Sequence, residues 1–377
     1  MKKQAMNRTQ TYRWLGMMLT GLLFLGMACL MVACSDDSGQ DVEDGDTLQL
    51  LTYSQALSRQ ENLATRAAME GYVTYTAGPI TAYMTPDGAD RATFFRYSTS
   101  TNKWSSAYKI QEGHTYYIYG FSPSDAVTGS SVSKFGSEGN YSGGALLTLN
   151  GLKPVLDKDF CLIVGIKQVD NANAPEPESI PLGGFIYEGK VKNQNFAYML
   201  LHHFYAALSF TMKVDATYNQ LRTIKLKKME LKDIPVSYNT VTIQVRPNST
   251  GSYPANNVTW LQSTEKATLQ FFKHDGLEDG LELNVDAQPL TLKMDTEDLE
   301  KIMVSPALSN SLTLVCTYDV YDKQGNLVRQ DCTAENKLQS VALTRGEWRT
   351  VNLTVNPTYL YVLSEPDLDN PTVVIGN

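Results

Sequence analysis

The sequence predicts an all-β protein built of two β-sandwich domains in tandem, with few short helices. Three observations lead to this fold class. Apolar and polar residues alternate with a period of two in many short segments beyond residue 70, which is typical of half-buried strands. Gly, Pro, Asn and Asp separate these segments at short intervals, which favours sandwiches over a parallel sheet. The apolar pattern restarts near residue 196, which predicts a second domain from there.

The first domain is predicted to span residues 67–195. Its strands, in chain order, read GYVTYTAG, ITAYMT, ATFFRYS, HTYYIYGFSP, DFCLIVGIKQV and GGFIYEGKV. Residues 171–184 (NANAPEPESIPLGG) form a proline-rich loop inside this domain. The loop interrupts the strand pattern without ending the domain, because GGFIYEGKV follows it.

The second domain is predicted to span residues 196–355. Its strand-like runs are YAALSFTMKV, RTIKLKKMEL, TVTIQV, ATLQFF, LTLVCTYDVY, NLVRQDCT and WRTVNLTV. In RTIKLKKMEL, the residues Ile224, Leu226 and Met229 form an inward face. Lys228 interrupts the alternation, which predicts a β-bulge.

One segment of the second domain is a helix candidate. Residues 294–303 read MDTEDLEKIM, so that Asp295 or Thr296 could cap a helix. Glu297 and Asp298 would then lie in its first turn, where acidic side chains are favoured.

Cys316 and Cys332 lie on either side of a predicted hairpin turn, DKQGN. Gly325 of this turn suits a left-handed position next to a bulge. If Asp322 pairs with Asn326, the two cysteines fall opposite each other with Cβ atoms about 4.5–5.5 Å apart, which a disulfide could reach after relaxation. Two buried free thiols are the alternative, because cysteine is a good small core residue.

The first 33 residues have the layout of an export signal. An apolar run covers residues 14–33, and the basic residues before it are Lys2, Lys3, Arg8 and Arg13. A run of this length could also stay in a bilayer as a spanning helix. Ala33 is the small residue that a processing peptidase needs, and Cys34 has no basic or aromatic flank of the kind that seats a spanning helix.

The end of this run resembles the lipobox of bacterial lipoproteins, with Met31 where leucine is usual. The resemblance implies cleavage between Ala33 and Cys34 and acylation of Cys34. Acyl chains on that residue would anchor the protein to a membrane, because each buried methylene contributes about 0.8 kcal/mol.

Residues 34–66 are predicted to be an acidic leader and a removable segment. Residues 47–54 (TLQLLTYS) are a β-capable run, and Arg59 and Arg66 follow in a linker that could also be a short helix. A trypsin-like protease could cut between Arg66 and Ala67. If the run is a strand of the first domain, this cut would release it and leave an unpaired sheet edge for another chain to fill.

The chain continues beyond its last predicted domain strand as a tail, residues 356–377. The tail contains two β-rich runs separated by SEPDLDNP. An isolated pair of strands is marginal in water, so these runs must join a sheet of their own body or of a neighbour. The first run consists of Tyr359, Leu360, Tyr361, Val362 and Leu363, and the second of Thr372, Val373, Val374 and Ile375.

Nothing in the composition or motifs indicates an enzyme, a cofactor or a nucleic-acid partner. The net charge is −8 and there is no basic block beyond the signal. His202 and His203 are adjacent in a strand-like run, so they point to opposite faces and cannot chelate one metal ion together. The expectation for them is a capped core histidine and a surface one.

Several of these stretches together resemble the fimbrillin-like proteins, the subunits of type V surface fimbriae of Gram-negative anaerobes. The stretches are the lipobox with its acidic follow-on, GHTYYIYGFSP, LLHHFYAALSFTMKV and RGEWRTVNLTVNPTYLYVLSEP. The resemblance implies two transthyretin-like sandwiches, an outer-membrane lipid anchor, and removal of an N-terminal segment by an arginine-specific protease, with Arg66 as the matching position and Arg59 as the fallback. It further implies polymerisation with other fimbrial subunits, as a homo- or hetero-polymer, through donor strands in the tail, and adhesion to a host or glycan ligand.

A monomeric surface glycan-binding lipoprotein of β-sandwich type is the alternative. Such a protein needs an exposed aromatic platform. The candidates are Trp104, Trp260 and Trp348, each of which could instead pack over a domain edge.

Overall fold

The computed structural model describes residues 48–59, 71–75, 78–86, 92–98, 103–104, 109–135, 141–170, 180–247, 254–274, 280–294, 297–339, 341–358 and 367–375. No helix within these ranges is long and apolar enough to cross a membrane. The expected signal sequence with Cys34, the cleavage pair Arg66 and Ala67, and the first tail run lie outside the described residues.

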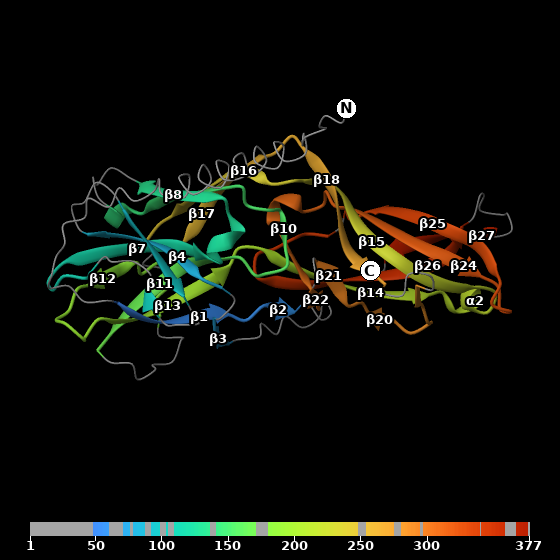
Figure 1. The fold of residues 1–377 in the computed structure, drawn as a ribbon, viewed down its shortest axis with the longest axis horizontal. Coiled ribbons are helices and arrows are strands. Elements are labelled where there is room, and N and C mark those ends of the chain that lie inside the picture. Colours follow the sequence, from blue (N-terminus) through green and yellow to red (C-terminus); the bar gives the residue numbers. More distant parts are fainter. Residues whose placement is uncertain are drawn as a thin grey trace, which may run out of the picture. The chain divides into compact units, whose positions relative to one another are not determined.

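The predicted all-β class is confirmed, because the described residues form sheets that pack as sandwiches (Figure 1). In the first sandwich, one sheet has the order β3-β1-β13-β11-β7-β4-β5-β6, with β12 on β7, and the facing sheet has the order β17-β16-β9-β8. The strands are β1 (Gln49–Gln55), β3 (Tyr72–Thr74), β4 (Ile80–Pro86), β5 (Thr93–Ser98), β6 (Lys103–Trp104), β7 (Thr115–Ser122), β8 (Gly129–Lys134), β9 (Ala145–Asn150), β11 (Cys161–Val169), β12 (Ile186–Glu188), β13 (Phe196–His203), β16 (Tyr238–Val245) and β17 (Ala255–Gln262).

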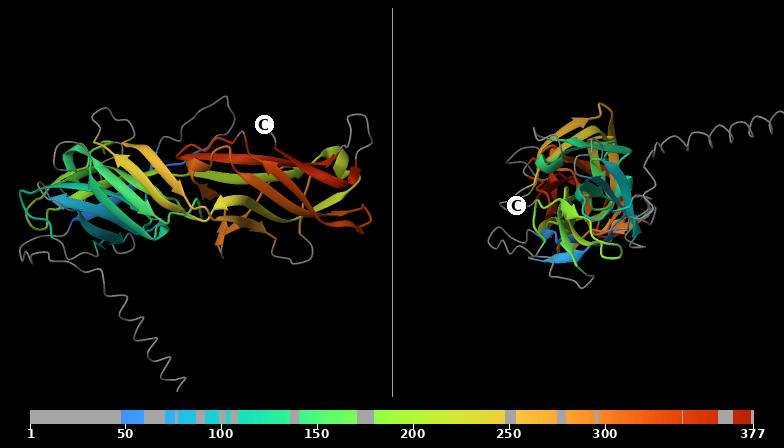
Figure 2. Two further views of the ribbon diagram at one scale, coloured as in Figure 1. Left: turned by 90° about the horizontal axis from the view of Figure 1, so that it is seen from above. Right: turned by 90° about the vertical axis from the view of Figure 1, so that its left-hand side faces the viewer.

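The second sandwich also consists of two sheets. One sheet has the order β10-β23-β14-β26-β2, with β20 on β14 and β27 on β26. The facing sheet has the order β18-β15-β24-β25, with β19 on β15. Figure 2 shows most of these strands in yellow to red, whereas β2 is blue and β10 is green. They are β2 (Ser58–Arg59), β10 (Val155–Leu156), β14 (Ala206–Val214), β15 (Thr223–Pro235), β18 (Lys266–Lys273), β19 (Leu281–Glu282), β20 (Gln288–Pro289), β23 (Ile302–Val304), β24 (Thr313–Tyr321), β25 (Leu327–Lys337), β26 (Glu347–Thr358) and β27 (Asp367–Ile375).

Each sandwich has its own buried cluster of apolar side chains, called here the first core and the second core. The first core is rich in buried tyrosines, and the Tyr119 hydroxyl donates to the Tyr141 carbonyl at 2.7 Å. The second core includes alternate residues of β14 and β15, among them Leu208 and Met229. Period-two burial of this kind is what the alternating sequence predicts.

Several strands depart from a simple division of the chain at residue 196. β2 and β10 precede that residue but join the second sandwich, and β13, β16 and β17 begin at or after it but join the first. β16 and β17 lie within 196–355, yet β16 pairs with β9 and Val241 and Ile243 belong to the first core. The 13-residue strand β15 precedes β16, and at about 3.3 Å per residue it is long enough to carry the chain from one sandwich to the other. Alternation marks an inward face but does not say which core receives it.

The prediction of a helix over residues 294–303 is wrong. In its place β21 (Leu292–Met294) and β22 (Glu297–Leu299) form a hairpin, and β23 follows. Acidic residues that would suit a first helical turn lie on an exposed hairpin strand instead, so helix propensity was overridden by strand pairing. The described α-helix is the single turn α2 (Ala216–Asn219), which Asp215 caps.

The bulge in β15 is confirmed, and the cysteine register is wrong. The β15–β24 ladder shifts between Leu226 and Lys228. In the β24–β25 hairpin, Tyr321 pairs with Leu327 as the turn predicts, but two register shifts then bring Cys332 opposite Tyr318. Cys316 faces Ala334, and both thiols are buried and free. The bulge residues could not be read from the alternation because β25 is largely exposed.

Candidate assembly interface

The first candidate region is the N-terminal segment, defined here as residues 48–59, which contains β1 and β2. β1 lies between two strands of the first sandwich: it is parallel to β13, with Leu50 beside Ala197, and antiparallel to β3, with Tyr53 opposite Thr74 (Figure 1). Residues 47–54, predicted from sequence to be β-capable, therefore lie largely in a strand within the sheet.

Alternate side chains of the N-terminal segment point into the first core. Leu48 and Leu50 retain 2% and 3% of their exposed surface. Thr52 and Ser54 continue this buried face, and Thr52 donates its hydroxyl to the carbonyl of Tyr75 at 3.0 Å. The inward residues become smaller and more polar toward the end of the strand. The apolar burial of the segment is thus concentrated at its start.

Main-chain bonds fix β1 at both ends. The amide of Gln49 donates to the carbonyl of Asn195 at 2.8 Å, and the amide of Ala56 donates to the carbonyl of Gly71 at 2.9 Å. The stretch that contains Arg66 connects this segment to Gly71 and β3. A single cut in that stretch would leave β1 held between β13 and β3 without a covalent bond to either strand.

The segment then passes to the second sandwich. Ser58 and Arg59 of β2 lie beside Glu347 and Trp348 of β26, in parallel. The amide of Ser58 donates to the carbonyl of Gly346 at 3.0 Å. Arg59 is therefore part of a β-ladder. A residue whose main chain is paired in this way is a poorer protease site than an extended unpaired residue.

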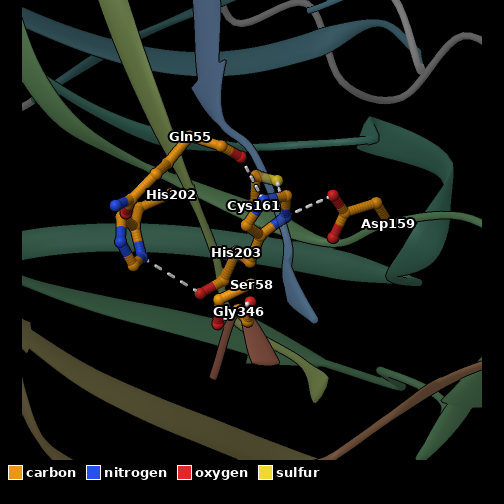
Figure 3. Close-up of polar contacts among 7 residues, drawn as sticks. All are labelled: Gln55, Ser58, Asp159, Cys161, His202, His203 and Gly346. Carbon is orange, nitrogen blue, oxygen red and sulfur yellow. Dashed lines mark hydrogen bonds and ion pairs between the residues drawn. The ribbon is translucent and has the colours of Figure 1, made fainter. Parts of the chain in front are cut away.

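A buried histidine contacts the segment between these two attachments (Figure 3). His203, at the end of β13, retains 4% of its exposed surface. Its Nδ1 lies 2.5 Å from Oδ2 of Asp159, and its Nε2 contacts the main-chain carbonyl oxygen of Gln55. Burial alone would lower the pKa of His203, but the hydrogen bond and charge of Asp159 and the Gln55 carbonyl outweigh it and raise that pKa.

The pKa of His202 is shifted in the opposite direction. His202 lies on the other face of β13 and its Nδ1 is 3.3 Å from the carbonyl oxygen of its neighbour His203. Burial, followed by the charge of His203, lowers the pKa of His202 to about 4. The two adjacent histidines therefore point apart, as period-two geometry predicts.

Asp159, Cys161 and His203 bring three metal-ligand atoms within 4.8 Å of one another. An ion bound by nitrogen and oxygen at about 2.0–2.2 Å would hold these two atoms roughly 3 Å apart. The Asp159–His203 separation of 2.5 Å is instead that of a hydrogen bond. Cys161, whose pKa is raised by burial, is a thiol 3.8 Å from Nδ1. The trio is a hydrogen-bonded cluster.

A pocket of about 750 Å³ opens at this end of the segment. It is lined by the end of β1, by β3, and by charged residues that include Asp157, Lys158 and Lys301. A second pocket of about 190 Å³ lies beside the start of β1 and is lined by Leu50 and Phe196 among others. Both ends of the strand thus border open space.

The second candidate region is the C-terminal strand β27, which contains the second tail run. β27 pairs antiparallel with β26 of the same chain, with Val373 opposite Val355 (Figure 2). Val373 is buried in the second core with 1% of its surface exposed, whereas Val374 is 44% exposed. The sequence left open whether the tail docks on its own body, and for this run the structure shows that it does.

Side chains of the body also fasten β27. The hydroxyls of Tyr318 and Tyr218 donate to the carbonyls of Pro371 and Leu368, at 2.6 and 2.8 Å. Arg222 forms an ion pair with Asp369 at 2.7 Å, and Asp369 is 53% exposed on its side chain.

Both candidate regions pair with the same strand, β26. One edge of β26 pairs with β14 over residues 348–355. Its other pairings are with β2 at Glu347 and Trp348, and with β27 from Leu353 to Thr358. The two ends of the folded chain are therefore attached to opposite ends of a single strand.

The tryptophans that could form a glycan-binding platform are Trp104, Trp260 and Trp348. Trp260 stacks on Phe204 with ring centroids 5.3 Å apart. Trp348 donates its indole N–H to Ser209, and the Lys301 ammonium covers its ring at 4.4 Å. The side chain of Trp104 is outside the described residues. Both described rings are packed against neighbours.

Sequence reasoning missed the contact of His203 with the N-terminal segment. The histidine pair was visible in LLHHFYAAL, but its partner is a main-chain carbonyl 148 residues away. A backbone acceptor leaves no side-chain signature.

A scan against protein-family models and a search of curated proteins both return no match. Among solved structures, a fimbrial protein of Bacteroides vulgatus is similar at 14% identity and TM-score 0.38, covering 88% of this chain and 98% of that one. A candidate cell adhesion protein of Bacteroides uniformis has 14% identity and TM-score 0.33, with coverage of 89% and 99%. The fimbrial anchor protein Mfa2 of Porphyromonas gingivalis has 11% identity and TM-score 0.24, with coverage of 86% and 95%. Two of these three neighbours are described as fimbrial proteins and one as a candidate cell adhesion protein.

Proposed function

We propose that the protein is a non-enzymatic structural subunit of a cell-surface fimbria, joined to other subunits by β-strand complementation after an arginine-specific cut. Its mature form would be lipid-anchored at Cys34 in the outer membrane until that cut. The observation that carries the proposal is the placement of β1. It is a strand inside a sheet, between β13 and β3, and one cut before Gly71 removes its covalent attachment.

Loss of the segment would expose the edge of β13 and the core sites of Leu48 and Leu50. An unpaired edge above an open core site is a ready acceptor for a strand from another chain. Main-chain ladders would supply affinity, and alternate apolar side chains would fix the register. The donor would be the tail of a second subunit, which is rich in such residues.

Within this proposal the tail of each subunit leaves its own body before it is donated. The docked state of β27 supports this order, because it keeps an exchangeable strand covered until an acceptor opens. The first run, Tyr359 to Leu363, would extend the same donated strand.

A gel tests the proposal. The chain from Ser35 to Asn377 is treated briefly with trypsin and run unboiled in SDS beside boiled and untreated samples. We expect a ladder only after treatment, with a new N-terminus at Ala67. Arg66→Ala is the matched control and should give no ladder while Arg59→Ala gives one. Only monomer in every lane would contradict the proposal and favour the glycan-binding alternative.

A further inference from the structure

The ring of His203 has an acceptor at each of its two nitrogens. Nδ1 faces the carboxylate of Asp159 and Nε2 faces the carbonyl oxygen of Gln55 (Figure 3). A neutral imidazole carries one N–H and an imidazolium carries two. Neither the carboxylate nor the carbonyl can donate. Both contacts are therefore hydrogen bonds only when the ring is protonated.

The charged neighbours of His203 have opposing effects. Asp159, which precedes β11, favours the protonated ring, and Lys301, between β22 and β23, disfavours it. Cys161 in β11 and His202 in β13 are neutral near pH 7, because burial raises the thiol pKa and lowers that of His202 to about 4. Further charged residues line the adjoining pocket: Asp157, Lys158, Asp298 and Glu300.

We propose that His203 is a pH-sensitive clamp on the N-terminal segment. The protonated ring ties the main chain at Gln55, the last residue of β1, to Asp159 of the body. When the ring loses a proton, the remaining N–H stays with the charged carboxylate. The lone pair of Nε2 then faces the Gln55 oxygen, and this end of the segment is pushed away.

The position of the clamp makes it effective, because a second attachment lies against the same ring. Gly346, whose carbonyl accepts from Ser58, has a positive φ of +71°. A Cβ at this position would lie 3.5 Å from Cδ2 of His203. The attachments of Gln55 and Ser58 are therefore both close to one imidazole, just before the stretch that is proposed to be cut.

The pH dependence follows from the sign of the shift. The folded-state pKa of His203 is raised above its usual value of about 6.5. The contribution of the clamp is fully present below about pH 6.5 and is lost as pH rises through the raised pKa. This inference deepens the proposed function, since it concerns how firmly the removable segment is held.

Hydrogen exchange of the uncut chain from Ser35 to Asn377 tests the clamp. Protection of amides in residues 48–58 is measured at pH 5.5 and pH 8.5 and corrected for intrinsic exchange. We expect about tenfold less protection at the higher pH, the effect of losing one charge-assisted hydrogen bond. The peptide that covers β27 is the internal control and should show no such step.

His203→Gln keeps one donor and cannot titrate. It should lower protection at pH 5.5 about tenfold and remove the pH step, and Asp159→Asn should act in the same way. Equal protection of the wild-type segment at both pH values would overturn the clamp, as would a step that persists in His203→Gln. If both variants unfold, the wild-type step must coincide with the ring titration of His203 seen by NMR. A mismatch there would also overturn it.

The exchange experiment uses the uncut chain and does not depend on polymerisation. A failed clamp therefore leaves the strand-complementation proposal intact, and a failed polymerisation assay leaves the exchange result intact.

Discussion

The two terminal strands of the folded chain are held in different ways. β1 pairs with β13 from Gln49 to Ser54 and with β3 from Tyr53 to Gln55, and Leu48 and Leu50 lie in the first core. β27 pairs with β26 and adds Val373 to the second core, where tyrosine hydroxyls and one exposed ion pair fasten it. An inner strand with covalent connections on both sides cannot exchange without a cut, whereas a terminal strand at a sheet edge can. The difference explains why cleavage would be needed at one end only.

The largest effect is expected from locking β1 to β3. Tyr53 and Thr74 are paired across the two strands, so Tyr53→Cys with Thr74→Cys places two thiols where a disulfide can form. After oxidation, trypsin should still cut at Arg66, but the ladder should be abolished because the segment cannot leave. Reductant should restore it. A ladder from the oxidised variant would mean that assembly does not require release of β1.

Locking β27 tests the other side of the comparison. Thr354 and Val374 are paired and face away from the core, so Thr354→Cys with Val374→Cys should leave the body intact. The oxidised variant should not polymerise alone. Mixed with wild type it should shorten the ladder, because it accepts a strand and donates none. Polymerisation of the locked variant alone would show that β27 stays on its own body.

Leu50→Ala should destabilise the uncut chain by about 2–4 kcal/mol, because it leaves a cavity at a buried leucine site. Leu51→Ala, on the less buried face, should cost roughly 1 kcal/mol or less. Urea unfolding measures both. Equal costs for the two variants would contradict the inward assignment of Leu50.

The smallest effects are expected at the side chains that fasten β27. Tyr318→Phe removes a buried hydrogen bond to Pro371 and should cost about 1 kcal/mol. Arg222→Ala removes an ion pair with the exposed Asp369 and should cost about 0.5 kcal/mol. Both should increase hydrogen exchange in β27 and leave exchange in β1 unchanged. An equal rise in β1 would mean that the two regions are coupled.

The sequence predicts the fold class and many strands because alternation and turn residues are local signals. It places Ile224, Leu226 and Met229 inward and a bulge beside Lys228, as the structure shows. It does not predict the pairing partners of those strands. The transfer of β16 to the first sandwich and the shifted register at Cys332 both depend on long-range packing and bulges.

The candidate site divides in the same way. The β propensity of residues 47–54 and of the second tail run was visible, and both form strands. The strands with which they pair could not be predicted, because the hydrogen bonds between strands are made by main-chain atoms that every residue has. For the same reason, the contact between His203 and the Gln55 carbonyl leaves no trace in the sequence.

The central claim is that a foreign strand replaces β1, and the fate of the cut segment tests it most directly. The polymer from trypsin-treated protein is purified in SDS without boiling, and residues 35–66 are quantified in it by mass spectrometry. The account predicts that the segment is absent from the polymer and recovered free in solution. One segment per subunit within the polymer would contradict it, because β1 would then still occupy its place beside β13.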